Sequence, residues 1–401
     1  MSAQPSSLSS PLLPRKPLAT EQFNWITEKF ESTAPRQLAF DWDSPASAIA
    51  EETFLPKDDT VTLLATESGS QLLISGFGLY IGKKGERVVV KQGKTVCAQV
   101  PMMRLQEIVI GSRGVSFSSD LLEELCGRGI RMACLNSSGK PYALVTSPLL
   151  TATVETRRCQ LLATTNEIGA EIARWLVAGK LRNQEKLLRY FAKSRREDTR
   201  HELERAAKAL RRLRQQALEA KGPAPDEVRN ALMGLEGTAG RMYWQQIARL
   251  LPEDAGFDGR EHRGAQDGVN AALNYGYGIL QAHVWGAVMN AGLEPFAGVL
   301  HVDRSGKPSL VLDLMEEFRQ PVVDRAILGW LNKGGVLRLE RGLLDGPSRE
   351  NVASRVLLRM NTTEQHRGKK HEIRSIIQMQ ARLAASAVRR HREYRPFSFR
   401  W

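Results

Sequence analysis

The sequence has few cysteines and no long apolar run. Its four cysteines form no CxxC pair, so their spacing fits neither a zinc site nor a disulfide framework: Cys97, Cys126, Cys134 and Cys159. No segment approaches the roughly 18 to 20 apolar residues that span a membrane, and the N-terminus has no apolar core of signal-peptide length. We therefore expect a cytoplasmic protein with reduced thiols and no membrane partner.

Acidic residues are outnumbered by basic ones. The chain of 401 residues holds 57 Lys and Arg against 44 Asp and Glu, which gives a formal net charge of +13. A protein this basic usually binds a polyanion, either nucleic acid or an acidic membrane surface. No zinc-finger or RNA-recognition signature is present, so we expect recognition of the DNA backbone and shape.

The positive charge gathers in residues 180–214 and in residues 366–400. Interleaved acidic residues indicate that part of the first stretch is a solvated helix face with i,i+4 ion pairs. In the C-terminal stretch, aromatic side chains alternate with arginines. Such aromatics stack on bases or pack onto the domain, and we favour packing for the aromatics and phosphate contacts for the arginines.

The pattern of apolar residues predicts an α+β protein: a small N-terminal β-sheet or sandwich domain followed by a larger all-α domain. Residues 1–58 are predicted to be a flexible N-terminal extension. Residues 59–147 carry short β-rich runs separated by glycine turns, which indicate the β domain. In residues 148–401, apolar residues recur every three or four positions, which predicts helices over 152–180, 182–197, 199–220, 225–251, 266–291, 313–333 and 371–393.

One short segment combines a histidine with several carboxylates. Ser305–Pro308 forms a turn, Ser309 is expected to cap the following helix, and His301 precedes the turn. On that helix three carboxylates at positions i, i+3 and i+4 share a face beside apolar residues: Asp313, Glu316 and Glu317. Carboxylates next to a core-facing stripe are costly unless they are paired or bind a ligand.

A further carboxylate, Glu236, lies in a predicted helix among small residues such as Gly234, Gly237 and Gly240. Glycine lowers helix propensity by about 1 kcal/mol relative to alanine, so such a cluster suggests that a ligand or another backbone comes close. The alternative is tight helix packing, with Glu236 paired to an arginine such as Arg241. Spacing alone does not bring Glu236 to His301.

Several motifs occur in an order that resembles one known family. The run GVLHVDRSGKPSLVLDLMEEFRQPVVDR resembles the signature of the CRISPR-associated spacer-acquisition endonuclease/integrase family, Cas1. GLEGTAGRMYW and DGVNAALNYGYGIL resemble two further motifs of that family. VPMMRLQEIVIGSRGVSFSSDLLEELCGRGI resembles its β domain, and YRPFSFRW its usual C-terminal ending. The resemblance covers about residues 60 to 401.

The resemblance implies a metal-dependent DNA endonuclease/integrase that inserts spacer DNA into a CRISPR array, by attack of a DNA 3′-OH on a phosphodiester. It implies that Glu236, His301 and Glu316 bind the metal and that Asp313 is an accessory catalytic residue. Glu316 is preferred over Glu317 as the metal ligand only because of its position in the family motif, and a shift of one residue would exchange the two. Two carboxylates and an imidazole suit Mg²⁺ or Mn²⁺.

The partners implied by the resemblance are double-stranded DNA, as spacer precursor and CRISPR repeat, and the small protein Cas2. The chain would form homodimers through the β domain, 59–147, with Cas2 bridging two dimers. Residues 148–401 would then be the catalytic and DNA-binding domain.

Two other functions fit the same residues. The first is a metal-dependent nuclease that acts on branched DNA outside CRISPR adaptation. Its chemistry is identical, so only the choice of substrate separates the two enzymes. The second is a non-catalytic DNA-binding scaffold, which predicts no metal-dependent activity and tolerance of Glu316→Ala.

Overall fold

The protein is described here by a computed structural model that covers residues 22–24, 29–31, 60–66, 69–147, 153–261 and 265–400. Its contacts divide the chain into two units, Met1–Ala48 and Ile49–Trp401. Most of the predicted extension, residues 1–58, lies outside the described residues. Within it, Gln22–Asn24 (β1) and Lys29–Glu31 (β2) pair as antiparallel strands.

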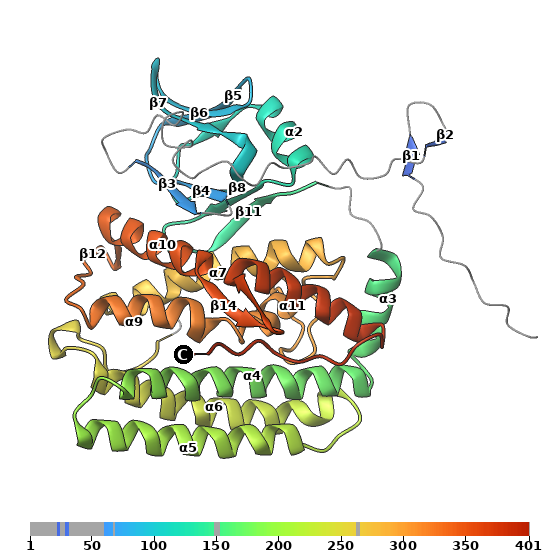
Figure 1. The fold of residues 1–401 in the computed structure, drawn as a ribbon, viewed down its shortest axis with the longest axis vertical. Helices are drawn as coiled ribbons and strands as arrows, with labels where there is room; N and C mark the ends of the chain where they lie inside the picture. Colours follow the sequence, from blue (N-terminus) through green and yellow to red (C-terminus); the bar gives the residue numbers. More distant parts are fainter. Residues whose placement is uncertain are drawn as a thin grey trace, which may run out of the picture. The chain divides into compact units, whose positions relative to one another are not determined.

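The second unit begins with two β-sheets (Figure 1). The larger has five strands in the order β11-β10-β8-β4-β3: Pro141–Val145, Arg131–Leu135, Leu105–Ile110, Gly69–Ile74 and Val61–Thr66. The smaller has four in the order β7-β6-β5-β9: Thr95–Pro101, Arg87–Gln92, Leu79–Lys84 and Ser116–Phe117. Helix α2, Ser119–Arg128, ends at Gly129, whose φ of 70° is the left-handed cap that glycine favours. The predicted β-sheet region ahead of the helices is confirmed.

The five-stranded sheet contributes side chains to two cores. Because successive side chains of a strand point to opposite faces, Leu72 and Ile74 enter the core between the two sheets. Leu73 and Val109 enter the core of the helical part. The sheet is therefore buried on both faces, as the wholly buried strand β4 shows.

The helical part follows the sheets, as predicted. Its helices are α3 (Thr153–Ala163), α4 (Glu167–Ala192), α5 (Glu197–Glu219), α6 (Pro225–Leu250), α7 (Gly268–Asn290), α8 (Ser309–Met315), α9 (Arg325–Leu331), α10 (Gly346–Asn361) and α11 (Ile373–Val388). Helices α4, α5 and α6 pack against one another in one layer (Figure 1). Helix α7 lies against α8, α10 and α11. Two short ribbons complete this part: Leu339–Glu340 (β12) with Leu343–Leu344 (β13), and Thr363–His366 (β14) with Lys369–Glu372 (β15).

Several predicted helix boundaries are wrong. Helix α4 runs unbroken through residue 181, and the break falls earlier, where the Asn166 side chain caps α4 by accepting from the Ile168 N–H. The predicted helix 313–333 is three pieces: α8, a π-helical segment Arg319–Asp324 and α9. Pro321, which lacks an N–H, lies in that segment. Helix α10 was not predicted.

Buried polar side chains join the sheet to the helices. Glu107 of β8 accepts from Gln71 of β4 and lies 3.4 Å from the ring of His283 on α7. Arg131 contacts the same histidine at 3.2 Å. Burial works to raise the pKa of Glu107, but the charges of Arg131 and His283 outweigh it and hold the pKa at about 2. This cluster fixes the large sheet against α7.

Among the described residues, no helix is both long and apolar enough to cross a membrane. The four cysteines are free thiols, as expected, although Cys134 alone is fully buried.

Candidate active site

The segment between α7 and α8 is wrapped around Asp313. One carboxylate oxygen of Asp313 accepts from the backbone N–H groups of Val299 and Leu300, at 2.8 and 2.9 Å. The other accepts from the backbone N–H of His301 at 2.9 Å and lies 2.6 Å from Nδ1 of the same histidine. A Cβ at Gly298 would lie 2.8 Å from Asp313 Oδ2, so only glycine leaves room for this turn. Both oxygens of Asp313 are therefore engaged within the protein.

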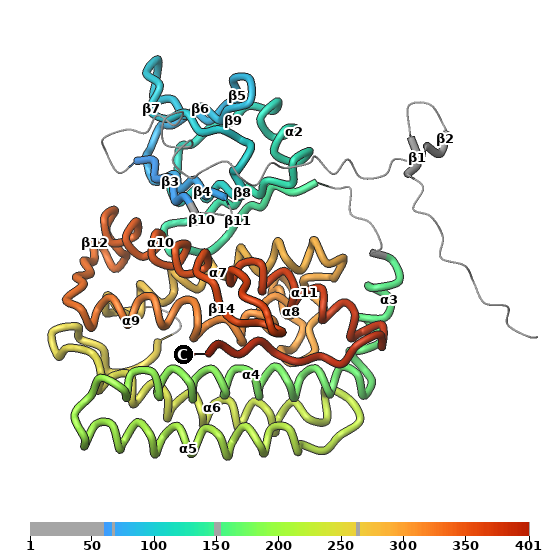
Figure 2. Tube along the Cα trace, viewed as in Figure 1, coloured from blue at the N-terminus to red at the C-terminus, as the bar shows by residue number. Residues whose placement is uncertain are grey.

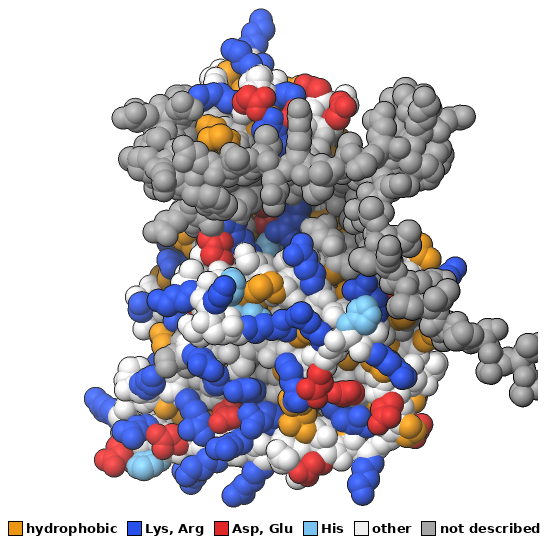
Figure 3. Space-filling view, turned by 45° about the vertical axis from the view of Figure 1, so that its right-hand side comes forward, with side chains coloured by type: hydrophobic (Ala, Val, Ile, Leu, Met, Phe, Trp, Pro, Cys, Tyr) orange, Lys and Arg blue, Asp and Glu red, His pale blue; other side chains and the backbone are white. Residues whose placement is uncertain are grey.

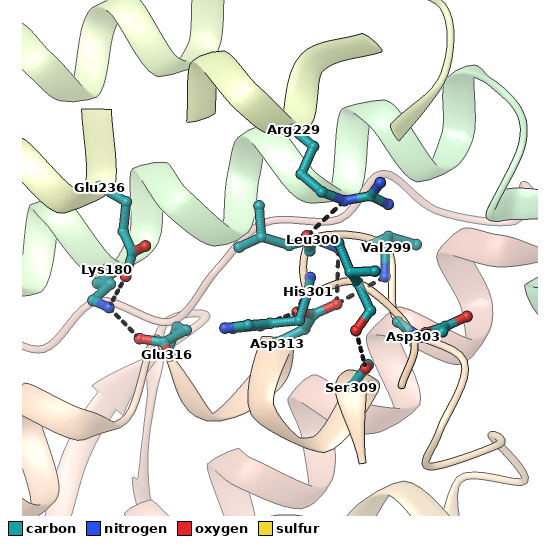
Figure 4. A network of polar contacts seen from close by, with 12 residues as sticks. Lys180, Arg229, Glu236, Val299, Leu300, His301, Asp303, Ser309, Asp313 and Glu316 are labelled. Carbon is teal, nitrogen blue, oxygen red and sulfur yellow. Dashed lines mark hydrogen bonds and ion pairs between the residues drawn. The ribbon is translucent and has the colours of Figure 1, made fainter. Parts of the chain in front are cut away.

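Asp313 sets the direction of the His301 ring. With Nδ1 bound to Asp313, Nε2 is the nitrogen available to a ligand, and the ring points toward Glu316 in Figure 4. A carboxylate that holds one imidazole nitrogen while the other binds a metal is a common arrangement. Burial works to lower the pKa of His301, but its hydrogen bond and charge interaction with Asp313 outweigh it and raise the pKa.

Glu316 follows directly on α8 and is 3% exposed. Its Oε1 accepts from Nε of Arg319 at 3.0 Å, and its Oε2 lies 2.6 Å from Nζ of Lys180 on α4. Burial works to raise the pKa of Glu316, but the charges of Arg319 and Lys180 hold it well below its usual range. Glu316 is therefore ionised at neutral pH.

Glu236 reaches the same place from α6. Its Oε1 accepts from Nζ of Lys180, so one ammonium group joins Glu236 and Glu316 (Figure 4). The alternative partner, Arg241, instead lies 3.4 Å from the Thr238 hydroxyl. The structure thus brings Glu236 and Glu316 together, with His301 beside Glu316.

Lys180 is a site residue that the sequence analysis did not single out. Burial works to lower the pKa of this ammonium, but the charges of Glu316 and Glu236 outweigh it and raise the pKa. A signal was present, because Lys180 lies one helical turn after the buried Leu176 and Val177, on the face of α4 that enters the core. A charge at such a position needs partners.

Glu317 does not share the face of Glu316, so that expectation is wrong. Helix α8 ends before it, and its buried carboxylate accepts from the Tyr394 hydroxyl at 2.7 Å and from Gln380 at 3.0 Å. It also accepts from the backbone N–H of Phe397. Burial raises the pKa of Glu317 to about 7, and these hydrogen bonds offset only part of the shift.

The chain end that Glu317 holds packs along α4 (Figure 2). The side chains of Tyr394, Phe397 and Phe399 are buried, which confirms packing for these aromatics. Asn183 of α4 donates to the Phe397 carbonyl at 3.0 Å, and Phe397 stacks on Phe318 at 5.6 Å between ring centroids. This contact ties α4, which carries Lys180, to the segment after α8.

Ser309 does not cap α8 through its side chain, contrary to expectation. The residue before the helix is Pro308, and the Ser309 hydroxyl donates to the Val302 carbonyl at 3.1 Å. This bond closes the loop that carries His301.

A buried carboxylate behind the site was also missed. Asp324 accepts from the hydroxyl groups of Tyr243, at 2.8 Å, and Tyr277. Burial raises the pKa of Asp324 to about 6, although both hydrogen bonds work to lower it. The guanidinium of Arg319 lies 4.6 Å from the centroid of the Tyr277 ring, so this network also supports the arginine that binds Glu316.

The side chains of the site carry the types of ligand atom that bind a divalent cation. Glu236 and Glu316 offer carboxylate oxygens, and His301 offers Nε2. The buried Oε2 of Glu316 accepts no hydrogen bond from the described residues, although the Lys180 ammonium is close enough for an ion pair. In the described ranges, however, no three His, Cys, Asp or Glu side chains are grouped as a metal site would require. The Lys180 ammonium lies between the two carboxylates.

The glycines beside Glu236 face open space. Apart from the adjacent residues and the backbone of α6 itself, no described atom lies within 4 Å of a Cβ built at Gly234, Gly237 or Gly240. The predicted close backbone contact is therefore absent from the described structure. The bare face of α6 next to Glu236 is accessible to a ligand.

The basic stretch 180–214 forms parts of α4 and α5. Figure 3 shows many Lys and Arg side chains spread over the lower part of the face, where these helices lie, with several acidic side chains interspersed among them. Some of the charges are paired along one helix, such as Arg189 with Glu185 at 3.2 Å and Arg200 with Glu204 at 3.1 Å. Some basic residues of the stretch thus form ion pairs on a solvated helix face, and the others give the surface an excess of positive charge.

Comparison with known proteins gives a consistent result. Residues 72–356 match the family model described as CRISPR associated protein Cas1. The CRISPR-associated endonuclease Cas1 1 of Archaeoglobus fulgidus is 35% identical in an alignment of 348 residues that covers 82% of this chain and 100% of that protein. The protein of the same name from Francisella tularensis subsp. novicida is 35% identical, over 82% of this chain and 99% of that protein.

Solved structures share the fold. A casposase bound to an integration product superposes with a TM-score of 0.68 at 21% identity, over 81% of this chain and 92% of the casposase chain. A Cas1 protein from Thermotoga maritima gives 0.65 at 19% identity, over 81% of this chain and 99% of that chain. A Cas6-RT-Cas1–Cas2 complex gives 0.66 at 21% identity, over 83% of this chain and 36% of that chain.

Proposed function

The chain belongs to the Cas1 family of CRISPR-associated proteins, and on that premise we propose that it is a metal-dependent DNA endonuclease and integrase of CRISPR adaptation. It inserts spacer DNA into the CRISPR array by attack of a DNA 3′-OH on a phosphodiester. One observation carries the proposal: Glu236 and Glu316 converge on one point from α6 and the end of α8, beside a His301 ring oriented by Asp313.

Glu236, Glu316 and Nε2 of His301 would hold Mg²⁺ or Mn²⁺. When bound, the metal polarises the phosphodiester and stabilises the charge that develops on the attacking and leaving oxygens. Three protein ligands leave coordination positions open to the DNA. With a 3′-OH as nucleophile the reaction is strand transfer, and with water it is hydrolysis.

The other residues of the site position these ligands. Asp313 holds the His301 ring with Nε2 outward and is a positioning residue rather than a ligand, because both its oxygens are engaged. Arg319 fixes the second oxygen of Glu316 from the side of the Tyr277 ring. The open glycine face of α6 lets a DNA backbone approach Glu236 closely.

The partners follow from the family assignment. Double-stranded DNA, as spacer precursor and CRISPR repeat, would lie on the basic surface of α4 and α5 and on the C-terminal arginines. The chain would act as a homodimer through the β domain, 59–147, with residues 148–401 as the catalytic and DNA-binding domain. Cas2 would bridge two dimers, and we expect the assembly to act in the cytoplasm.

The test is a strand-transfer assay with a leader–repeat plasmid, a 3′-OH spacer duplex and the Cas2 partner, with and without Mg²⁺ or Mn²⁺. Metal-dependent joining is expected from the unchanged protein and none from Glu236→Gln. Glu227→Gln, at an exposed position of the same helix, is the matched control and should remain active. Normal joining by cleanly folded Glu236→Gln would overturn the site.

The same assay separates the alternatives. Metal-dependent cleavage of branched DNA without joining to the plasmid would identify a nuclease outside adaptation. DNA binding without any metal-dependent reaction would identify a scaffold.

A further inference from the structure

We propose that Lys180 is a built-in countercation, and that a divalent metal binds Glu236 and Glu316 only by displacing its ammonium group. The inference rests on the proposed function and adds a residue that controls when the metal site forms. It concerns the metal's access to the site rather than the reaction itself.

The position of Lys180 carries the inference. Its Nζ lies 2.6 Å from Oε2 of Glu316 and donates to Oε1 of Glu236, so it occupies the space between the two carboxylates. The Lys180 side chain is 13% exposed, against 4% for that of Glu316. The lysine backbone is fixed within α4, with the buried Gly179 and Leu181 on either side. The flexible part is therefore the side chain, which can swing its ammonium away from the carboxylates.

The charges at the site are balanced as they stand. Among the four side chains joined by these ion pairs, Lys180 and Arg319 are positive and Glu236 and Glu316 are negative, so their charges sum to zero. A divalent cation added with Lys180 in place would leave two excess positive charges in a largely buried site. Because like charges a few ångströms apart repel strongly when solvent is scarce, the metal and the ammonium exclude each other.

Displacement of Lys180 by the metal gives the remaining groups a net positive charge, which favours binding of the negatively charged DNA backbone. With the ammonium swung away, the two carboxylates, Arg319 and a divalent cation sum to one positive charge, which a phosphodiester neutralises. Metal binding and DNA binding then assist each other, and the metal binds weakly before DNA arrives. Lys180 would thus limit metal-dependent cleavage in the absence of substrate.

The experiment compares Lys180→Met with Lys193→Met in the full-length protein, after removal of metal with EDTA. Lys193 lies at the exposed end of the same helix, so its variant removes one charge of α4 away from the site. Mn²⁺ is titrated by electron paramagnetic resonance, with and without a DNA duplex. Couplings between ligands that affect one site typically change affinity about 5- to 150-fold, and we expect a gain in this range for Lys180→Met without DNA. In the titration without DNA, Lys193→Met should match the unchanged protein. Equal or weaker Mn²⁺ binding by folded Lys180→Met would overturn the proposal and leave Lys180 a structural link between α4, α6 and α8.

A measurement on the unchanged protein covers the case in which Lys180→Met does not fold. Lysines are acetylated with and without saturating Mn²⁺, and each site is quantified by mass spectrometry. We expect Mn²⁺ to increase the acetylation of Lys180 and to leave that of Lys193 constant. Protection of Lys180 that persists at saturating Mn²⁺ contradicts displacement.

The titration also separates this inference from the proposed function. Glu236→Gln and Glu316→Gln are included, and both should lose Mn²⁺ binding. If both bind Mn²⁺ like the unchanged protein, the metal site itself is wrong. If both lose binding while Lys180→Met gains none, only the role of Lys180 fails.

Discussion

Glu316 and Glu317 are neighbours in sequence, but their carboxylates bind different partners. Glu316 contacts Lys180 and Arg319 at the candidate metal site. Glu317 accepts hydrogen bonds from Tyr394 and Gln380 and holds the C-terminal stretch. Helix α8 ends between Met315 and this pair, so a helical face no longer governs their directions.

The first prediction concerns this pair. Glu316→Gln should reduce Mn²⁺ binding and strand transfer by about 100-fold or more, exceeding the roughly 10- to 100-fold cost of losing an outer partner of a ligand. Glu317→Gln should bind Mn²⁺ like the unchanged protein. Mn²⁺ titration and a thermal melt of both variants provide the check, and a loss of Mn²⁺ binding confined to Glu317→Gln would reverse the assignment.

The second prediction concerns Asp313. Asp313→Asn keeps one oxygen for the backbone N–H groups but loses the carboxylate that holds Nδ1 of His301. We expect Mn²⁺ affinity to fall about 10- to 100-fold, as for other outer partners of metal-binding histidines. Isothermal titration calorimetry measures it, with the exposed Asp303→Asn as the control. Unchanged affinity would show that the ring is oriented without Asp313.

The third prediction is a pH dependence. The pKa of Glu317 rises from 4.5 to about 7 in the folded protein, so between these values the folded state holds more protons than the unfolded state. The free energy of unfolding should therefore fall as pH rises through this window. At about 1.4 kcal/mol per pKa unit, the contribution is up to roughly 3 kcal/mol. Urea unfolding at pH 5 and pH 8 should show that Glu317→Gln gains stability relative to the unchanged protein at the higher pH. A difference that does not vary with pH would contradict it.

The fourth prediction contrasts two helical glycines. A Cβ at Gly278 of α7 would lie 1.7 Å from the carbonyl oxygen of Gly139, so Gly278→Ala should destabilise the protein by at least the roughly 1–3 kcal/mol of core overpacking. Gly237 of α6 has open space around it, and Gly237→Ala should stabilise the helix by up to about 1 kcal/mol. Chemical denaturation of both variants tests the contrast, and equal stability would refute it.

The sequence predicted the features that neighbouring residues determine. The apolar spacing predicted the sheets before the helices. The contacts between distant residues were not predictable from spacing. Lys180 and Glu236 are 56 positions apart, and Tyr394 lies 77 positions from Glu317, so local periodicity carries no information about either pair.

The predicted helix boundaries were wrong where the local sequence pattern was ambiguous. Apolar spacing continues across residue 181, and the cap at Asn166 was overlooked. The apolar pattern also continues across the π-helical Arg319–Asp324, whose different hydrogen bonding leaves no clear mark in the sequence. At the site, resemblance joined Glu236 to His301, whereas residue chemistry alone left that pairing open.

The five-stranded sheet, buried on both faces, has a practical consequence for dissecting the protein. A fragment cut off after residue 147 would retain the core between its sheets but expose Leu73, Val109, Ala133 and Leu135 to water. Its bare, apolar sheet face would favour self-association over a monomeric fragment. The helical fragment would lose the matching surface. The sequence boundary between strands and helices is thus not a boundary at which either half folds independently.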